Sequence, residues 1–220
     1  MPAGSKPPVK SKACSYPGSR SRPFHVSSGP RQNSGSTVQS ADGVTAGPDI
    51  VATTPRLRLR EITRQDAAFI LELVNQPDWL RHIGDRGVNN LAQAADYIET
   101  RMRSAYSSDG YGMYVVENLE DHMAIGLCGL VNRDWLPCPD LGFAILSRFH
   151  RRGFAIEASR AAVTLAWERF DLDHLVAVTT LQNTASQQLL GKLGFELRDQ
   201  KFHTPENEYL YLYSLICDRA

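Results

Sequence analysis

The sequence has few cysteines and no long apolar run. Its cysteines form no CxxC pair and show no metal-ligand spacing with histidine, which argues against a zinc site and against a disulfide framework. They are Cys14, Cys128, Cys138 and Cys217. No apolar stretch approaches the ~20 residues of a membrane-spanning helix, and the first residues lack the apolar core of a secretory signal. We therefore expect a cytoplasmic protein with reduced cysteines that does not bind a membrane.

Several catalytic patterns are also missing. The histidines are scattered, without an HExxH pair, and the sequence contains neither a GxSxG elbow nor a GxxxxGK[ST] loop. These absences argue against a zinc protease, a serine hydrolase of the α/β-hydrolase type and a P-loop NTPase. We expect no metal cofactor.

Net charge is lacking as well, because 24 Lys and Arg residues balance 24 Asp and Glu residues. The charges are unevenly spread: residues 1–50 contain six basic and two acidic residues, which leaves 18 and 22 in residues 51–220. An acidic body argues against nucleic acid as a partner, since a phosphate-binding protein needs a basic face. The small excess of acidic residues suits a cationic amine substrate.

Residues 1–52 are rich in Ser, Pro and Gly and poor in branched aliphatic residues. Such a segment cannot bury enough apolar surface to offset its ordering entropy, so we expect a disordered basic tail followed by one folded domain at residues 53–220. An organellar transit peptide would also be basic and Ser-rich. The density of proline and the lack of an amphipathic helix favour a flexible tail or an over-extended reading frame.

The predicted domain alternates between strand and helix patterns. Two-residue alternation and apolar runs predict strands at residues 57–60, 112–117, 123–131, 141–146, 175–180, 195–198 and 209–216. Helical periodicity and capping residues predict helices at residues 63–74, 91–106, 154–170 and 183–193. The polar turn at 118–121 predicts a hairpin between the second and third strands.

The turn before the helix at 154–170 has the features of an anion-binding turn. It consists of His150, Arg151, Arg152, Gly153, Phe154 and Ala155. Gly153 provides a bare backbone position, and the helix that starts there presents unpaired N–H groups and a partial positive charge. Arg151 and Arg152 add positive charge. In the simpler alternative, Gly153 only starts a helix and both arginines are solvated.

A second segment, Asn183-Thr184-Ala185-Ser186, opens the helix at 183–193, which closes at Lys192-Leu193-Gly194-Phe195. Asn183 is a favourable N-cap residue, and Ser186 lies three residues later on the same side of the first turn. Taken alone, Asn183 is a plain cap and Ser186 a hydroxyl at a helix start.

Together with the turn at 150–155, this segment resembles the acyl-CoA site of the GNAT superfamily of N-acetyltransferases, in particular its RimJ/RimL-like branch. The resemblance extends over residues 53–217. It implies a mixed α/β (α+β) fold whose twisted mixed sheet splays between its fourth and fifth strands, with flanking helices. It also implies acetyl-CoA as acyl donor, with contacts at Leu141, Phe143, Ile145, His150, Arg151, Arg152, Gly153, Phe154, Ala155, Asn183 and Ser186.

The resemblance further implies that Ser186 protonates the departing thiolate of CoA. The amine acceptor must lose a proton before it attacks, so we expect a carboxylate near the splayed strands. Asp140, just before the strand at 141–146, is the preferred candidate, and Glu208 is a weaker one. A purely structural role for Asp140 at the strand end remains an alternative.

Three polar residues are candidates for contacts with the acceptor. Asp85 and Arg86 lie in the loop before the helix at 91–106, a region that lines the acceptor side in this superfamily, and Arg133 follows the third predicted strand. Trp79, Trp135 and Tyr114 are candidates for the pocket wall, although aromatic residues of this kind are more often part of the core.

The sequence thus predicts an N-acetyltransferase that transfers an acetyl group from acetyl-CoA to a primary amine by direct attack in a ternary complex. The amine is a small molecule or a protein N-terminus, with a slight preference for the former. The alternative is a catalytically silent acyl-CoA-binding regulatory module on the same fold. A nucleic-acid binder acting through the basic tail is disfavoured. We expect a monomer or a homodimer.

Overall fold

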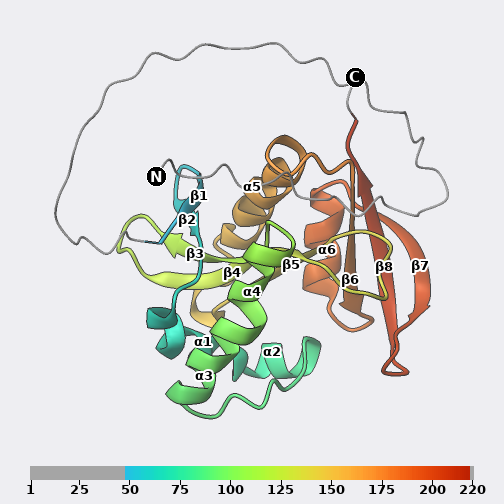
Figure 1. Ribbon diagram of the computed structural model, residues 1–220. Coiled ribbons are helices and arrows are strands. Elements are labelled where there is room, and N and C mark those ends of the chain that lie inside the picture. Colours follow the sequence, from blue (N-terminus) through green and yellow to red (C-terminus); the bar gives the residue numbers. More distant parts are fainter. Residues whose placement is uncertain (1–47, 219–220) are drawn as a thin grey trace, which may run out of the picture.

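A mixed β-sheet with helices on both of its faces forms the body of the protein (Figure 1). The structure, a computed structural model, describes residues 48–218. The strand order is β1-β2-β3-β4-β5-β6-β8-β7, and all neighbours are antiparallel except β5 and β6. The strands are β1 (Ile50–Thr53), β2 (Leu57–Arg60), β3 (Met113–Asn118), β4 (Ala124–Val131), β5 (Asp140–Ile145), β6 (His174–Thr180), β7 (Glu196–His203) and β8 (Tyr209–Ile216).

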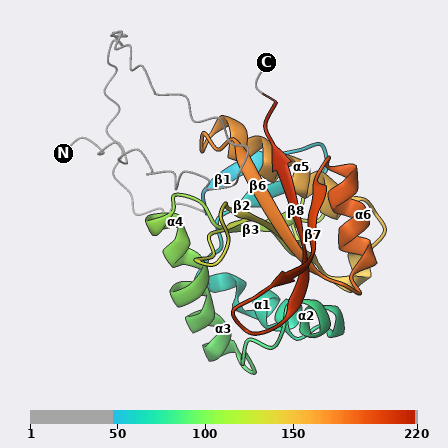
Figure 2. The same ribbon diagram turned by 90° about the vertical axis from the view of Figure 1, so that its right-hand side faces the viewer.

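The helices divide between the two faces of the sheet. Figure 2 shows α3 and α4 on one side and α5 and α6 on the other. The α-helices are α1 (Ala67–Val74), α2 (Pro77–His82), α3 (Leu91–Tyr97), α4 (Ser104–Ser108), α5 (Phe154–Glu168) and α6 (Thr184–Lys192). Short 3-10 turns at Arg64–Asp66 and Ser147–Phe149 precede α1 and follow β5, and a π-helical segment at Ile98–Arg103 joins α3 to α4.

Burial on both faces accounts for the apolar sequences of the central strands. β3 and β4 are buried along nearly their whole length. Helix α5 covers one face through Ala158, Ala162 and Ala166, each at most 1% exposed. Such small side chains let a helix approach a sheet closely, and α5 packs against β4 and β5.

The predicted strands and helices are all present, with ends that differ by a few residues. The predicted helix at 63–74 starts with a capping box formed by Thr63 and Asp66. Two elements were not predicted: α2, and β1, which pairs with β2 and begins before the expected domain start at residue 53. The expected helix at 91–106 contains the π-helical segment, and β7 extends beyond its predicted end at 198. Residues 1–47, most of the predicted tail, lie outside the described residues.

The sheet splays between β5 and β6, as predicted. These two parallel strands pair only at Asp140 and Val176, whereas β4 and β5 pair from Gly126–Ile145 through Val131–Asp140. Beyond Asp140 the two strands diverge. Because β1 was not predicted, the fourth and fifth strands of the prediction are β5 and β6 of the structure.

The expectation that the cysteines are reduced is wrong for Cys138. Cys138 is disulfide-bonded, while Cys128 and Cys217 are free thiols. Within residues 48–218, no helix combines the length and apolarity that crossing a bilayer requires.

Candidate active site

The turn at 150–155 leads from the 3-10 turn that follows β5 into the start of α5, and its backbone is unusual. Arg151 and Gly153 both have left-handed backbone conformations, with φ of 61° and 80°. Gly153 is the N-cap residue of α5, and no side chain caps this helix start. Because the first N–H groups of a helix have no acceptor within the helix, the turn presents uncapped donors at the positive end of a 15-residue helix. This arrangement suits an anionic group such as a pyrophosphate.

The other residues of the turn have distinct environments. The His150 Nε2 atom lies 2.7 Å from the Ile145 carbonyl oxygen, so its ring closes the turn back onto β5. Phe154 is buried and packs edge-on against Phe149, which anchors the helix start in the core. The side chains of Arg151 and Arg152 are exposed, and Ala155 is half-buried. The two arginines thus present exposed guanidinium groups at this turn, and the Arg152 Cζ atom lies 5.4 Å from the centre of the Phe149 ring.

The edge of β5 beside the splay is open. Leu141, Phe143 and Ile145 pair with β4 on one side, whereas on the other side β5 pairs with β6 only at Asp140. Leu141 and Ile145 are buried and Phe143 is half-buried. Backbone groups along this edge are therefore available to an extended ligand with amide groups, in the manner of an added strand.

The start of α6 contributes Asn183 and Ser186. The Asn183 Oδ1 atom accepts a hydrogen bond from the Ser186 backbone N at 3.0 Å, so the predicted N-cap is confirmed. The cap uses the amide oxygen of Asn183, which leaves its NH₂ group for another contact. The Ser186 side chain is half-buried.

Asp140 occupies the closed end of the splay and is almost fully buried, with 2% exposure. Its Oδ2 atom accepts from the Arg133 Nε at 2.8 Å, and its Oδ1 atom accepts from the Val178 backbone N of β6 at 3.3 Å. Burial raises the pKa of this carboxyl, and the Arg133 guanidinium opposes that shift. Each oxygen thus accepts one hydrogen bond, and through Val178 the carboxylate ties β5 to β6 where the strands meet. Glu208, the weaker candidate for the base, is exposed in the turn between β7 and β8.

Two of the predicted acceptor residues lie together. Asp85 and Arg86 line a pocket of 370 Å³ with Tyr97 and Arg101. Arg133, the third, pairs with Asp140 instead, and its guanidinium lies 5.5 Å from the centre of the Trp135 ring. Of the proposed pocket aromatics, Trp79 and Tyr114 are buried in the core.

Helix α2 bridges the ends of the two diverging strands. Before it, the Gln76 Oε1 atom accepts hydrogen bonds from the Ser147 backbone N and hydroxyl at 2.9 and 2.8 Å, just after β5. At its end, the His82 Nδ1 atom lies 2.9 Å from the hydroxyl oxygen of Thr180, the last residue of β6. No sequence signal marked His82, because its contact joins residues that are 98 positions apart.

Comparisons with known proteins agree with this architecture. Residues 56–196 match the family described as acetyltransferase (GNAT) domain. The uncharacterized N-acetyltransferase YoaA of Bacillus subtilis (strain 168) is 28% identical over 149 residues, which are 66% of this chain and 82% of YoaA. The uncharacterized N-acetyltransferase p20 of Bacillus licheniformis is 25% identical over 74% of this chain and 94% of p20.

Solved structures share the fold. An acetyltransferase from Agrobacterium tumefaciens str. C58 superposes with a TM-score of 0.65 at 20% identity, over 80% of this chain and 99% of that chain. RimL, a ribosomal L7/L12 alpha-N-protein acetyltransferase in complex with Coenzyme A, has a TM-score of 0.59 at 15% identity, over 78% of this chain and all of RimL. The family match covers more than half of the sequence and contains the turn, the splay and the start of α6: the chain belongs to the GNAT family of acetyltransferases.

Proposed function

We propose that this N-acetyltransferase uses acetyl-CoA as acyl donor and a primary amine as acceptor. The observation that carries the proposal is the uncapped start of α5, with its left-handed Gly153, directly beside the open edge of β5. The helix start suits the pyrophosphate of CoA, and the open strand edge suits the two amide groups of its pantetheine arm. The donor contacts assigned from the sequence, from Leu141 to Ser186, belong to this proposal.

In the proposed reaction, the neutral amine nitrogen attacks the thioester carbonyl carbon, the C–S bond breaks, the CoA thiolate takes a proton from Ser186, and the nitrogen gives up a proton to solvent as the amide forms, which restores the Ser186 hydroxyl through water. Ser186 is the proposed proton donor, because it lies in the first turn of α6, across the splay from β5. The enzyme needs no covalent intermediate. Its contribution is to hold the amine and the thioester in line, an effect that supplies roughly 7–11 kcal/mol in favourable cases.

Asp140 has a different role in this mechanism from that of a general base. Its carboxylate already accepts hydrogen bonds from Arg133 and Val178, so we propose that it fixes the closed end of the splay and thereby the path of the pantetheine arm. Asp85 and Arg86 remain the proposed acceptor contacts, in the pocket that they share with Tyr97 and Arg101.

The acceptor class is the open part of the proposal. RimL, one of the structural neighbours, is by name an acetyltransferase of a ribosomal protein, whereas YoaA and p20 are uncharacterized. We propose that the chain belongs to the RimJ/RimL-like branch and that its acceptor is a small-molecule amine, with a protein N-terminus as the second candidate.

The test is thiol release from acetyl-CoA in the presence of a panel of small primary amines and of peptides with free N-termini. Thiol release that depends on one class of amine and is lost in Ser186→Ala supports acetyl transfer at this site and identifies the class of acceptor. Tight binding of acetyl-CoA without release from any amine would favour the alternative, a silent regulatory module.

A further inference from the structure

Arg56, which immediately precedes β2, contacts the turn at 150–155 from the side of the first strands. Its Nη1 atom donates to the Arg152 carbonyl oxygen at 3.0 Å. A Cβ atom built on Gly153 would lie 3.4 Å from its Nη2 atom, so the guanidinium lies directly against the glycine. Its Cζ atom is 4.7 Å from the centre of the Phe154 ring. One side chain thus contacts three consecutive residues of the turn.

This contact fixes the orientation of one peptide group. In a trans peptide the C=O and the following N–H point in opposite directions. Because the Arg152 carbonyl oxygen points at Arg56, the Gly153 N–H points away from β2. A rotation of this peptide would exchange the two groups and turn a carbonyl oxygen toward an incoming anion. Glycine at position 153 makes such a rotation sterically accessible, so another group must prevent it.

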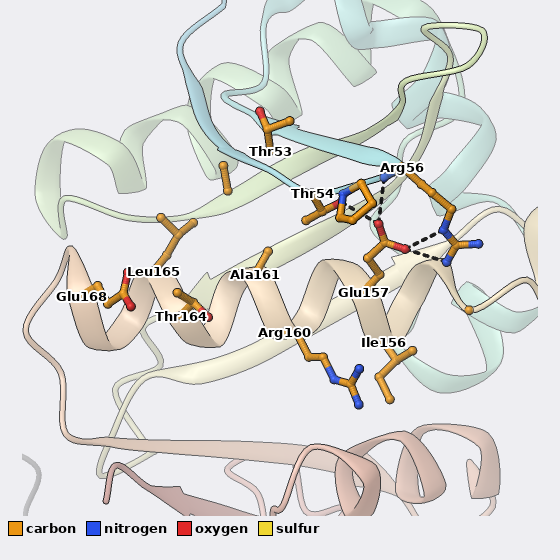
Figure 3. Close-up of a pocket in the computed structure, with 13 residues that line it drawn as sticks. Thr53, Thr54, Arg56, Ile156, Glu157, Arg160, Ala161, Thr164, Leu165 and Glu168 are labelled. Atoms are coloured by element: carbon orange, nitrogen blue, oxygen red, sulfur yellow. Dashed lines mark hydrogen bonds and ion pairs between the residues drawn. The ribbon is translucent and has the colours of Figure 1, made fainter. Parts of the chain in front are cut away.

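Arg56 is itself held by Glu157, a partly buried carboxylate on α5 (Figure 3). Its Nε and Nη2 atoms lie 2.7 and 2.6 Å from the Glu157 Oε2 atom, and its backbone N donates to Oε1 at 3.1 Å. The Thr54 hydroxyl donates to the same Oε1 atom at 2.6 Å. The Glu157 side chain is 17% exposed and that of Arg56 is 48% exposed. A carboxylate with this many donors holds the guanidinium in place, unlike an isolated surface ion pair.

We propose that Arg56 is a positioning residue for acyl-donor binding: it holds the Arg152–Gly153 peptide so that the Gly153 N–H faces the anion. The inference rests on the proposed function, in which the turn at 150–155 binds the pyrophosphate of CoA. Glu157 and Thr54 complete the device, because they hold the guanidinium against the turn.

A rival explanation is that Arg56 binds a phosphate group directly through its charge. The two explanations differ in the sign of the effect of Glu157→Gln. If Arg56 only positions the peptide, loss of the carboxylate loosens the guanidinium and weakens CoA binding. If Arg56 binds phosphate directly, removal of a competing carboxylate leaves CoA binding unchanged or makes it tighter.

The experiment measures binding of CoA and of pantetheine, which lacks the pyrophosphate, by calorimetry. The variants are Arg56→Met, which keeps an unbranched side chain over Phe154, Arg56→Lys, which keeps the charge, and Glu157→Gln. Arg56, Glu157 and Arg160 line one groove of 790 Å³ beside α5 (Figure 3). The matched control is Arg160→Met, because Arg160 lies one helical turn after Glu157 in this groove. Melting temperatures report whether each variant is folded.

We expect CoA affinity to fall about tenfold or more in all three variants, while pantetheine affinity and the Arg160→Met control change by less than about twofold. Arg56→Lys does not restore binding, because one ammonium group cannot reproduce the planar fork of donors that engages both Glu157 and Arg152.

CoA affinity in Arg56→Met within about twofold of the wild type would overturn the inference, and so would equal losses for CoA and pantetheine. Weak binding in Arg56→Met with tighter binding in Glu157→Gln would replace positioning by direct phosphate contact. If the wild-type protein binds no CoA, the proposed function fails before the role of Arg56 is reached, so the two failures are distinguishable.

Discussion

Gly153 provides the sharpest test of the turn, because a side chain there has two separable effects. At φ of 80° any residue with a Cβ is strained, at a cost of about 1–2 kcal/mol. In a domain of this size, each kcal/mol lowers the melting temperature by roughly 2–4 °C. Gly153→Ala should therefore destabilise the protein by this amount. The strain is present in both the free and the bound protein, so by itself it changes CoA affinity little.

Gly153→Asp adds a negative charge where the pyrophosphate is proposed to bind. Two like charges about 4 Å apart repel by about 4 kcal/mol at an effective dielectric constant of 20. This repulsion exists only in the complex, so it weakens binding directly, and we expect a loss of CoA affinity of about 10²-fold or more. The new carboxylate also competes with Glu157 for the Arg56 guanidinium, whose Nη2 atom is 3.4 Å from the built Cβ position.

The assay is calorimetric titration with CoA, together with thermal unfolding, for Gly153→Ala, Gly153→Asp and the control Gly191→Asp. Gly191 lies in α6, where a Cβ would meet no atom within 4 Å, so this control adds the same charge without crowding. We expect the control to bind CoA almost as the wild type does. Undiminished affinity in Gly153→Asp would refute the assignment of the turn as the pyrophosphate site.

Three further predictions concern the chemistry and the pH dependence. Ser186→Ala should lower kcat by about 10²-fold or more and spare CoA affinity; a kcat within about twofold of the wild type would exclude Ser186 as the acid. Asp140→Asn should lower the melting temperature, because it leaves Arg133 without its carboxylate, yet keep kcat within about fivefold; a loss of about 10²–10⁴-fold would restore Asp140 as the base. Burial raises the pKa of Glu157, but hydrogen bonds from Thr54 and Arg56 outweigh it and hold the pKa below its usual 4.5. Glu157 therefore adds stability that is present above pH 4.5 and lost as the pH falls through the lowered pKa, so denaturant unfolding between about pH 5 and 3 should show a smaller loss in Glu157→Gln than in the wild type.

Features encoded by neighbouring residues could be predicted from the sequence. Gly153 and the two arginines before it lie within one turn, and Asn183 caps a helix through a residue only three positions away. The splay followed from the resemblance to the GNAT superfamily, and the structure confirms it at the single pairing of Asp140 with Val176.

Long-range contacts could not be predicted in the same way. Arg56 and Glu157 are 101 positions apart, and no pattern in either segment indicates that their side chains meet. Asp140 was identified as a carboxylate near the splay, but its burial and its contact with the Val178 backbone N, 38 positions away, follow from the packing of β5 against β6. Helix α2 is only six residues long, too short for a periodic signal, and β1 depends on its pairing with β2.

The central claim is that the start of α5 and the edge of β5 bind acetyl-CoA. Its most direct test is calorimetric titration of the wild-type protein with acetyl-CoA and, separately, with free CoA. We predict micromolar binding of both, equivalent to about −8 kcal/mol. No heat of binding at ligand concentrations of several hundred micromolar would contradict the account, because the turn at 150–155 would then be no more than the start of a helix.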